Sequence, residues 1–190
     1  AFSFAYPFQL EGWRRAGADI TFFSPLKDES PDTSADAIFL PGGYPELHAE
    51  RLAHCTRFID CIRTAADRGA IVYGECGGYM VLGETLTDSA GKTHPMIGLL
   101  PVKTSFQDSR LHLGYRALSL ATDGPLGPRG ATFRGHEFHY SRILQEETSA
   151  SLFEVSDALG QNLPATGCRL NSVMGSFIHL IDHQAPSQAG

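Results

Sequence analysis

The sequence lacks the features that would place it in a membrane, on nucleic acid or in a disulfide-bonded scaffold. No apolar run approaches the roughly 18 residues of a transmembrane helix. The net charge is −6 and no basic run occurs, which argues against nucleic acid as a partner. The four cysteines form no C-x-x-C pair, and no signal peptide is visible at the start. A reducing, cytoplasmic setting is therefore expected.

The composition is that of one compact domain with a sizeable core. Of the 190 residues, 42% are hydrophobic. Strand-like and helix-like segments alternate over residues 1–82, a pattern typical of a parallel sheet in an α/β domain. Shorter alternating segments follow, and they predict a mixed or antiparallel edge. We expect a three-layer α/β fold in which helices flank a mostly parallel central sheet.

The individual elements are predicted from periodicity and from glycine and proline positions. We expect helices over 7–17 and 46–68, a hairpin over 85–95, and strands over 19–23, 37–40, 70–73, 111–120, 132–141, 152–155 and 171–180. Residues after His183 are expected to be a loose tail.

The segment around Cys76 carries the strongest chemical signal. An apolar strand runs into Gly74-Glu75-Cys76-Gly77-Gly78, and a helix is expected to follow. This is the strand–elbow–helix pattern of a nucleophile, with small neighbours two residues away on each side. A sulfur at a helix N-terminus is expected to favour the thiolate. The alternative is a buried core cysteine beside a glycine turn.

A second glycine turn, Pro41-Gly42-Gly43, follows the strand over 37–40. Two glycines allow the backbone to turn its N–H groups into a pocket. A cysteine nucleophile needs such donors for its oxyanion, so the two loops reinforce each other. An ordinary strand-to-helix turn is the alternative for this segment.

A cysteine nucleophile also needs a base, and histidine is the usual one. His179 ends an apolar strand and is expected at the carboxyl edge of the sheet, beside the elbow. His136 and His139 compete with His179 for the role of the base. These two histidines, with Glu137 between them, could also suggest a metal site, but their spacing places them on opposite faces of a strand, which disfavours metal binding. The group that orients the base remains open between three acids, Asp182, Glu137 and Glu75.

Four motifs occur in an order that resembles one known family. They are Leu-Pro-Gly-Gly-Tyr-Pro-Glu-Leu-His-Ala (40–49), Gly-Glu-Cys-Gly-Gly-Tyr-Met-Val-Leu-Gly (74–83), Arg-Gly-His-Glu-Phe-His-Tyr-Ser (134–141) and Gly-Ser-Phe-Ile-His-Leu (175–180). The chain resembles the C-terminal glutaminase domain of the cobyrinic or hydrogenobyrinic acid a,c-diamide synthases, a class I, triad-type glutamine amidotransferase. The resemblance covers residues 1–183, and the remainder, 184–190, is expected to be a flexible tail.

The resemblance implies a chemistry for these residues. Cys76 would attack the side-chain amide of glutamine, and His179 would move the proton. The backbone N–H groups of Gly43 and Gly77 would hold the oxyanion. Residues expected to face glutamine or its oxyanion are Gly42, Tyr44, Tyr79, His136 and His139.

The resemblance also implies partners outside this domain. Ammonia would pass to an N-terminal synthetase domain that amidates the corrin a and c carboxylates with ATP and Mg²⁺. No cofactor and no metal are expected in the glutaminase domain itself, and a homodimer is left open.

Two positions depart from the common class I pattern. Ile181 stands where a triad Glu would follow His179 by two residues, and Met80 stands where a Gln would follow Cys76 by four. Both departures are similar to the a,c-diamide branch, and Met80 disfavours the alternative, the amidotransferase domain of cobyric acid synthase or of another related ligase. The missing Glu leaves a further alternative, a non-catalytic module with a vestigial elbow. The first strand of the class I amidotransferase fold is expected to precede Ala1.

Overall fold

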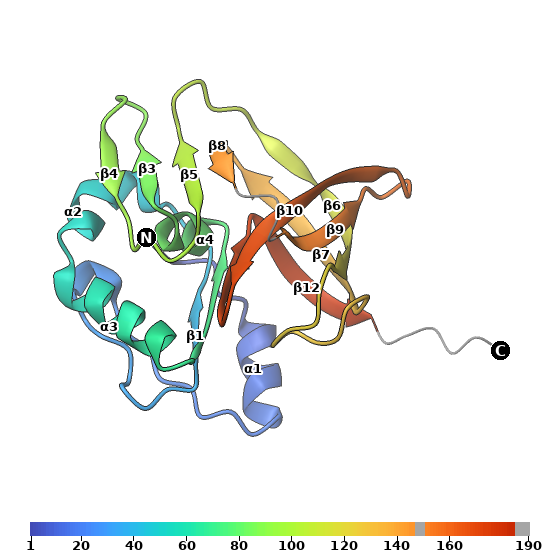
Figure 1. The fold of residues 1–190 in the computed structure, drawn as a ribbon, viewed down its shortest axis with the longest axis horizontal. Helices are drawn as coiled ribbons and strands as arrows, with labels where there is room; N and C mark the ends of the chain where they lie inside the picture. Colours follow the sequence, from blue (N-terminus) through green and yellow to red (C-terminus); the bar gives the residue numbers. More distant parts are fainter. Residues whose placement is uncertain (147–150, 185–190) are drawn as a thin grey trace.

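The computed structural model describes residues 1–146 and 151–184 (Figure 1). The larger sheet holds eight strands in the order β1-β2-β11-β10-β9-β6-β7-β12, and a smaller sheet has the order β4-β3-β5-β8. The strands are β1 Ala37–Leu40, β2 Ile71–Glu75, β3 Thr85–Thr87, β4 Thr93–Pro95, β5 Val102–Ser105, β6 His112–Leu120, β7 Thr132–His139, β8 Arg142–Glu146, β9 Ser151–Ser156, β10 Asn162–Leu170, β11 Val173–Ser176 and β12 Ile178–Gln184. The helices are α1 Pro7–Arg15, α2 Ala49–Ala53, α3 Thr56–Asp67 and α4 Gly77–Leu82, with short 3-10 turns at Pro25–Lys27 and Pro45–His48.

The α/β class is confirmed, but the expected balance of parallel and antiparallel strands is wrong. In the larger sheet β2 pairs in parallel with β1 and β11, whereas every pairing from β11 to β12 is antiparallel. Parallel neighbours need a crossover of about a dozen residues or more, usually through a helix. No helix follows Leu82 in the described part of the chain, so the later strands are joined by turns and loops. The mixed edge is therefore larger than the parallel part.

The parallel end of the sheet is covered on both faces, which gives the three layers expected there. One face of β1 and β2 packs on α3, whose Phe58 and Ile62 are fully buried. On the other face, Trp13 of α1 meets Phe39 of β1 edge to face, with ring centroids 5.3 Å apart. Figure 1 shows α1 beside β1 and the antiparallel strands curling away from this layered part. A second core cluster, which includes Phe153 and Met174, fills the curled half.

The long helix expected over 46–68 is interrupted. A 3-10 turn and α2 precede α3, which starts anew at Thr56. The Asp28 carboxylate accepts the backbone N–H groups of Phe58, at 2.8 Å, and of Arg57, at 3.3 Å. These bonds satisfy N–H groups of the first turn of α3, which have no partner inside the helix. The break depends on a residue about thirty positions earlier, which periodicity does not show.

The strand expected over 19–23 does not form. These residues carry no ladder pairing, and β1 pairs only with β2 among the described strands. An extended segment becomes a strand only when another strand satisfies its backbone groups. The helix over 7–17 is confirmed as α1, and the hairpin over 85–95 as β3 and β4.

The strand expected over 171–180 is two strands. β11 is parallel to β2, and β12 begins after Phe177 and pairs antiparallel with β7. Strands β5, β8 and β10 were not predicted. β10 contains Pro164 and Gly167, which usually break a strand, and its pairing with β9 shifts register between Leu163 and Thr166. The irregular pairing accommodates Pro164 and Gly167, and these two residues explain why the sequence pattern did not predict a strand here.

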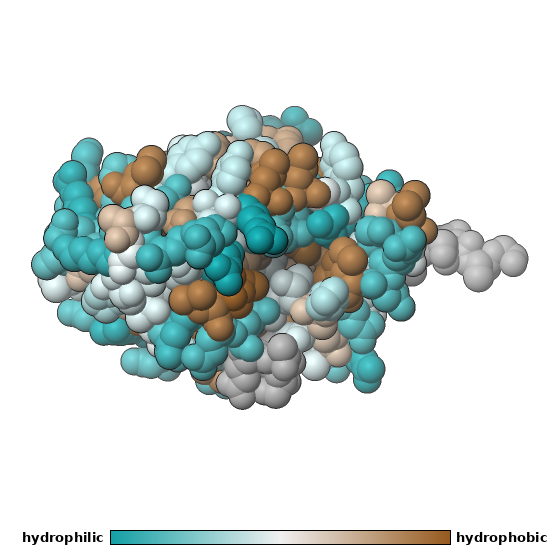
Figure 2. All heavy atoms as spheres, turned by 90° about the horizontal axis from the view of Figure 1, so that it is seen from above, coloured by the Kyte–Doolittle hydropathy of each residue, from teal (hydrophilic) through white to brown (hydrophobic). Residues whose placement is uncertain are grey.

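Only the first residue of the expected tail over 184–190 lies within the described chain. Gln184 belongs to β12, and residues 185–190 lie outside the described residues. None of the helices within residues 1–146 and 151–184 is both long and apolar enough to cross a membrane. Seen from above, apolar side chains form separate groups between hydrophilic ones on that face (Figure 2).

Candidate active site

Cys76 occupies the turn between β2 and α4, as its glycine neighbours predict. Its φ of 47° and ψ of −102° form a backbone conformation that residues with a side chain rarely adopt. A Cβ on Gly78 would lie 1.9 Å from the carbonyl oxygen of Leu40, so the turn closes against β1 only with glycine there. The backbone N–H of Cys76 donates to the carbonyl of Ser176 at 2.8 Å. The strained residue is thus fixed by the strands on both sides of β2.

The two glycine loops predicted to cooperate meet at this turn. A Cβ on Gly77 would lie 2.9 Å from the backbone nitrogen of Gly43, which places the two backbones in direct contact. The N–H groups of Gly77 and Gly43 both bond to the Cys76 sulfur and act to lower its pKa. Two converging N–H groups beside a nucleophile form the arrangement that holds an oxyanion.

The expected thiolate is wrong for this structure. Burial, with a smaller contribution from the carboxylates of Glu46 and Glu75, raises the pKa of Cys76 to about 12 against the lowering effect of the two loop N–H groups. Cys76 is only 4% exposed, and removing an anion from water outweighs the dipole of the six-residue helix α4. The sulfur donates to the carbonyl oxygen of Phe138 at 3.7 Å. The resting group is therefore the thiol, which needs a base before it can attack.

His179 reaches the site by a different route from the one expected. It is the second residue of antiparallel β12, directly after β11, and pairs with His136 of β7. The ring lies against the oxyanion loop, because a Cβ on Gly42 would be 2.4 Å from His179 Cε1 and 3.2 Å from Nε2. Cys76 contacts the same strand β7 through Phe138. The structure thus brings the predicted nucleophile, the predicted base and Gly42–Gly43 together.

Two further rings hold His179 in place. The His136 ring stacks on it, with centroids 4.9 Å apart and an angle of 15° between planes. Tyr6 meets His179 edge to face at 6.0 Å, and its hydroxyl lies 3.2 Å from His136 Nε2. His136 therefore lies beside His179, and its role toward glutamine stays a prediction. Tyr6 was not predicted, and nothing in the residues near it signals this contact.

Glu75 stands on the other side of His179. Its Oε2 lies 3.5 Å from His179 Nδ1, and the two residues are 1% and 2% exposed. The sequence left this residue open as one of three acids. A signal was present, because a charged residue closes the otherwise uncharged strand over 71–75. The other two acids lie elsewhere: Asp182 is exposed, and Glu137 is held by Arg116 and His139.

Tyr79 does not face a substrate, contrary to expectation. It is fully buried, its hydroxyl donates to Glu146 Oε1, and its ring packs edge to face on Phe177. Burial raises the pKa of Glu146. Tyr44 is 46% exposed and meets Phe4 edge to face, so its role toward glutamine stays a prediction.

His139 belongs to a different cluster from His179. Its Nε2 lies 2.9 Å from Glu137 Oε1, and its ring stacks on His112 at 4.6 Å. The ligand atoms of His112, Glu137 and His139 all lie within 4.8 Å of one another, a spacing that a metal ion can bridge. However, the Arg116 guanidinium lies 2.7 Å from Glu137 Oε2. Because this cation neutralises the carboxylate, we assign no metal to the cluster.

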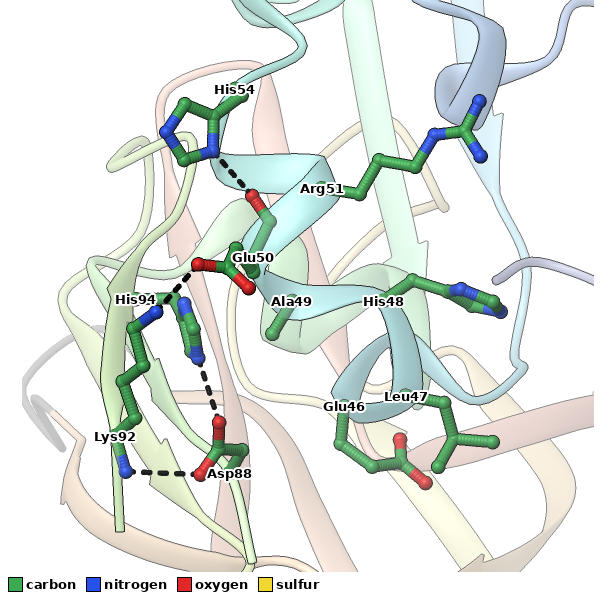
Figure 3. A pocket seen from close by; sticks show the side chains of 10 residues that line it. All are labelled: Glu46, Leu47, His48, Ala49, Glu50, Arg51, His54, Asp88, Lys92 and His94. Carbon is green, nitrogen blue, oxygen red and sulfur yellow. Dashed lines mark hydrogen bonds and ion pairs between the residues drawn. The ribbon is translucent and has the colours of Figure 1, made fainter. Parts of the chain in front are cut away.

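A separate hollow of about 400 Å³ lies over α2 and the β3–β4 hairpin (Figure 3). Two pairs of its side chains bind each other: Lys92 Nζ lies 2.6 Å from Glu50 Oε1, and His94 Nε2 lies 2.8 Å from Asp88 Oδ2. The nucleophile and the base do not line it. The elbow, rather than this hollow, is the candidate catalytic centre.

Two relatives match almost the whole chain. Hydrogenobyrinate a,c-diamide synthase of Brucella abortus biovar 1 is 59% identical over 184 residues, which are 96% of this chain and 41% of the relative. The protein of the same name from Rhodobacter capsulatus is 53% identical over 181 residues, 95% of this chain and 41% of the relative. The chain therefore spans about two fifths of the length of these relatives.

Solved structures and a family profile agree with this likeness. A glutamine amidotransferase structure has a TM-score of 0.57 at 17% identity, covering 90% of this chain and 82% of its own. A glutamine amidotransferase of Thermotoga maritima has a TM-score of 0.58 at 14% identity, covering 90% and 69%. These two matches support the fold alone. The profile of the CobB/CobQ-like glutamine amidotransferase domain matches residues 1–186, so the chain belongs to this family.

Proposed function

We propose that this chain hydrolyses glutamine to glutamate and ammonia through a thioester on Cys76. The observation that carries the proposal is the convergence of a strained thiol, two backbone N–H donors and a buried histidine at one point. Family membership supports it, because the family is one of glutamine amidotransferases. Because these groups lie together, the site favours an active glutaminase over a non-catalytic module with a vestigial elbow.

The first half of the reaction follows from the geometry. His179 takes the thiol proton as the Cys76 sulfur attacks the side-chain carbonyl carbon of glutamine. The N–H groups of Gly43 and Gly77 stabilise the oxyanion of the tetrahedral intermediate. When the intermediate collapses, the C–N bond breaks and His179 returns the proton to the leaving nitrogen. Ammonia leaves, and the γ-glutamyl thioester remains on Cys76.

The second half restores the thiol. His179 takes a proton from a water molecule, which attacks the thioester carbonyl, and the same two N–H groups hold the second oxyanion. Collapse breaks the C–S bond, and the proton returns to the sulfur. Because burial keeps the pKa of Cys76 near 12, the resting enzyme is returned to its neutral form.

The ammonia acceptor is inferred from the relatives, whose names give hydrogenobyrinate a,c-diamide synthase. The ammonia would amidate the a and c side-chain carboxylates of hydrogenobyrinic or cobyrinic acid, a step of cobalamin biosynthesis. A synthetase domain outside residues 1–190 would activate these carboxylates with ATP and Mg²⁺. The names of these relatives favour this branch over cobyric acid synthase.

The test measures ammonia release and amide transfer by the full-length protein that carries this domain. Glutamine labelled with ¹⁵N in the amide group should label hydrogenobyrinate a,c-diamide in the presence of ATP and Mg²⁺. Cys76→Ser should lower ammonia release by about 10³-fold or more, since the nucleophile is lost. Cys61→Ser, on the outer helix α3, is the matched control and should retain activity. Unchanged ammonia release in Cys76→Ser would refute the proposal.

A further inference from the structure

Glu75 is a carboxylate in an unusual place. It ends β2, between β1 and β11 in the parallel part of the sheet, and is 1% exposed. A buried carboxylate is costly unless hydrogen bonds or an opposite charge compensate it. The residues before it in β2 carry no charge. The Glu75 carboxylate therefore needs a partner that offsets the cost of its burial.

The two carboxylate oxygens have different partners. Oε1 accepts the backbone N–H of Leu180 at 3.1 Å. Oε2 lies 3.5 Å from His179 Nδ1, and neither of these two atoms has a hydrogen-bond partner among the described residues. One oxygen thus anchors the carboxylate to β12, and the other remains available to the imidazole ring. At 3.5 Å the pair lies just outside the range of about 2.7–3.2 Å that N–H···O hydrogen bonds occupy.

The orientation of the ring completes the geometry. The Cε1–Nε2 edge of His179 lies against Gly42, on the side of the loop whose Gly43 N–H bonds to the Cys76 sulfur. The opposite nitrogen, Nδ1, faces Glu75. If Nδ1 carries the proton, Nε2 is left with the lone pair that a general base needs. The direction of the ring and the position of the carboxylate thus select the same tautomer.

We propose that Glu75 positions His179 for glutamine hydrolysis, by holding Nδ1–H and stabilising the imidazolium that forms when the thiol proton is transferred. This role rests on the proposed glutaminase function. It assigns the third member of the triad to the residue just before the nucleophile, and Ile181, two residues after the base, is 39% exposed. Because Glu75 is only 1% exposed and faces His179, it acts through His179.

A structural role is the competing explanation, because Oε1 also fixes β12 through Leu180. Glu75→Gln separates the two roles. The amide keeps the shape and an oxygen that accepts the Leu180 N–H, but it loses the negative charge. Asp182→Asn is the matched control, since it makes the same kind of change in an exposed acid on β12.

The experiment measures kcat and KM for glutamine in the full-length protein, with melting temperature and circular dichroism as checks of folding. Glu75→Gln should lower kcat by about 10²-fold or more, while KM stays within about threefold, because the charge acts on the base rather than on substrate binding. Its melting temperature should stay close to that of the wild type. Asp182→Asn should retain wild-type kcat.

Three results would overturn the inference. One is a kcat for Glu75→Gln within about threefold of the wild type. Another is a loss of kcat that is matched by a loss of folded structure in Glu75→Gln. The third is a larger loss in Asp182→Asn than in Glu75→Gln. The comparison of the wild type with Cys76→Ser separates this failure from that of the proposed function. If Cys76→Ser releases as much ammonia as the wild type, the proposed function fails. If Cys76→Ser loses ammonia release but Glu75→Gln does not, only the role of Glu75 fails.

Discussion

The elbow and the curled half of the sheet supply the two sides of one site in different ways. The elbow is encoded locally, because Cys76 and the glycines that permit its conformation lie within a few residues of each other. His179 is placed by β12, whose pairing with β7 joins residues about forty positions apart. Local sterics can be recognised in a short stretch of sequence, whereas long-range pairing cannot.

The protonation state of Cys76 gives the largest expected effect on the elbow side. Burial raises the pKa of its thiol to about 12, so the thiolate fraction should rise about tenfold per pH unit below that value. Alkylation of Cys76 by iodoacetamide, without glutamine, should therefore accelerate about 10³-fold from pH 7 to pH 10. Mass spectrometry of the modified peptide gives the rate, and Cys76→Ser provides the background from the other cysteines. A plateau below pH 9 would show that the elbow stabilises the thiolate after all.

The contact between the two regions is broken most directly at Gly42. In Gly42→Ala the new methyl group would lie 2.4 Å from His179 Cε1, and the ring is the part that can move. Displacing the base by about 1 Å should lower kcat about 10²-fold with little loss of stability. Gly12→Ala in α1 is the matched control, because apart from the adjacent backbone of its own helix no atom lies within 4 Å of its added Cβ. Equal kcat values in both variants would mean that His179 is not fixed against the loop.

His136 tests how firmly β7 holds the base, and the effect should be the smallest. Its ring stacks on His179 at 4.9 Å, and such a contact contributes about 0.5–1.5 kcal/mol. His136→Ala should therefore lower kcat by about two- to tenfold while Cys76 labelling is retained. The exposed His54→Gln is the control and should behave as the wild type. A loss as large as that of Cys76→Ser would place His136 in the chemistry itself.

Several features of the fold and the site could be predicted because the responsible residues are close together in the chain. The strand over 37–40, the elbow and the hairpin over 85–95 belong to this group. The break before α3 could not be predicted, since Asp28 is far from Phe58 in the sequence. Nor could the burial of Tyr79, because a residue beside a nucleophile can face the core as readily as the substrate.

The sequence by itself determined the strand–elbow–helix turn at Cys76, the second glycine loop and the family, since glycine sterics and motif order are properties of neighbouring residues. Only the tertiary structure decided which acid faces His179 and which state the thiol adopts. Both depend on burial and on groups from separate strands: Glu75 meets His179 across the sheet, and removal from water sets the pKa of Cys76. These are properties of the assembled interior, which no single stretch of sequence contains.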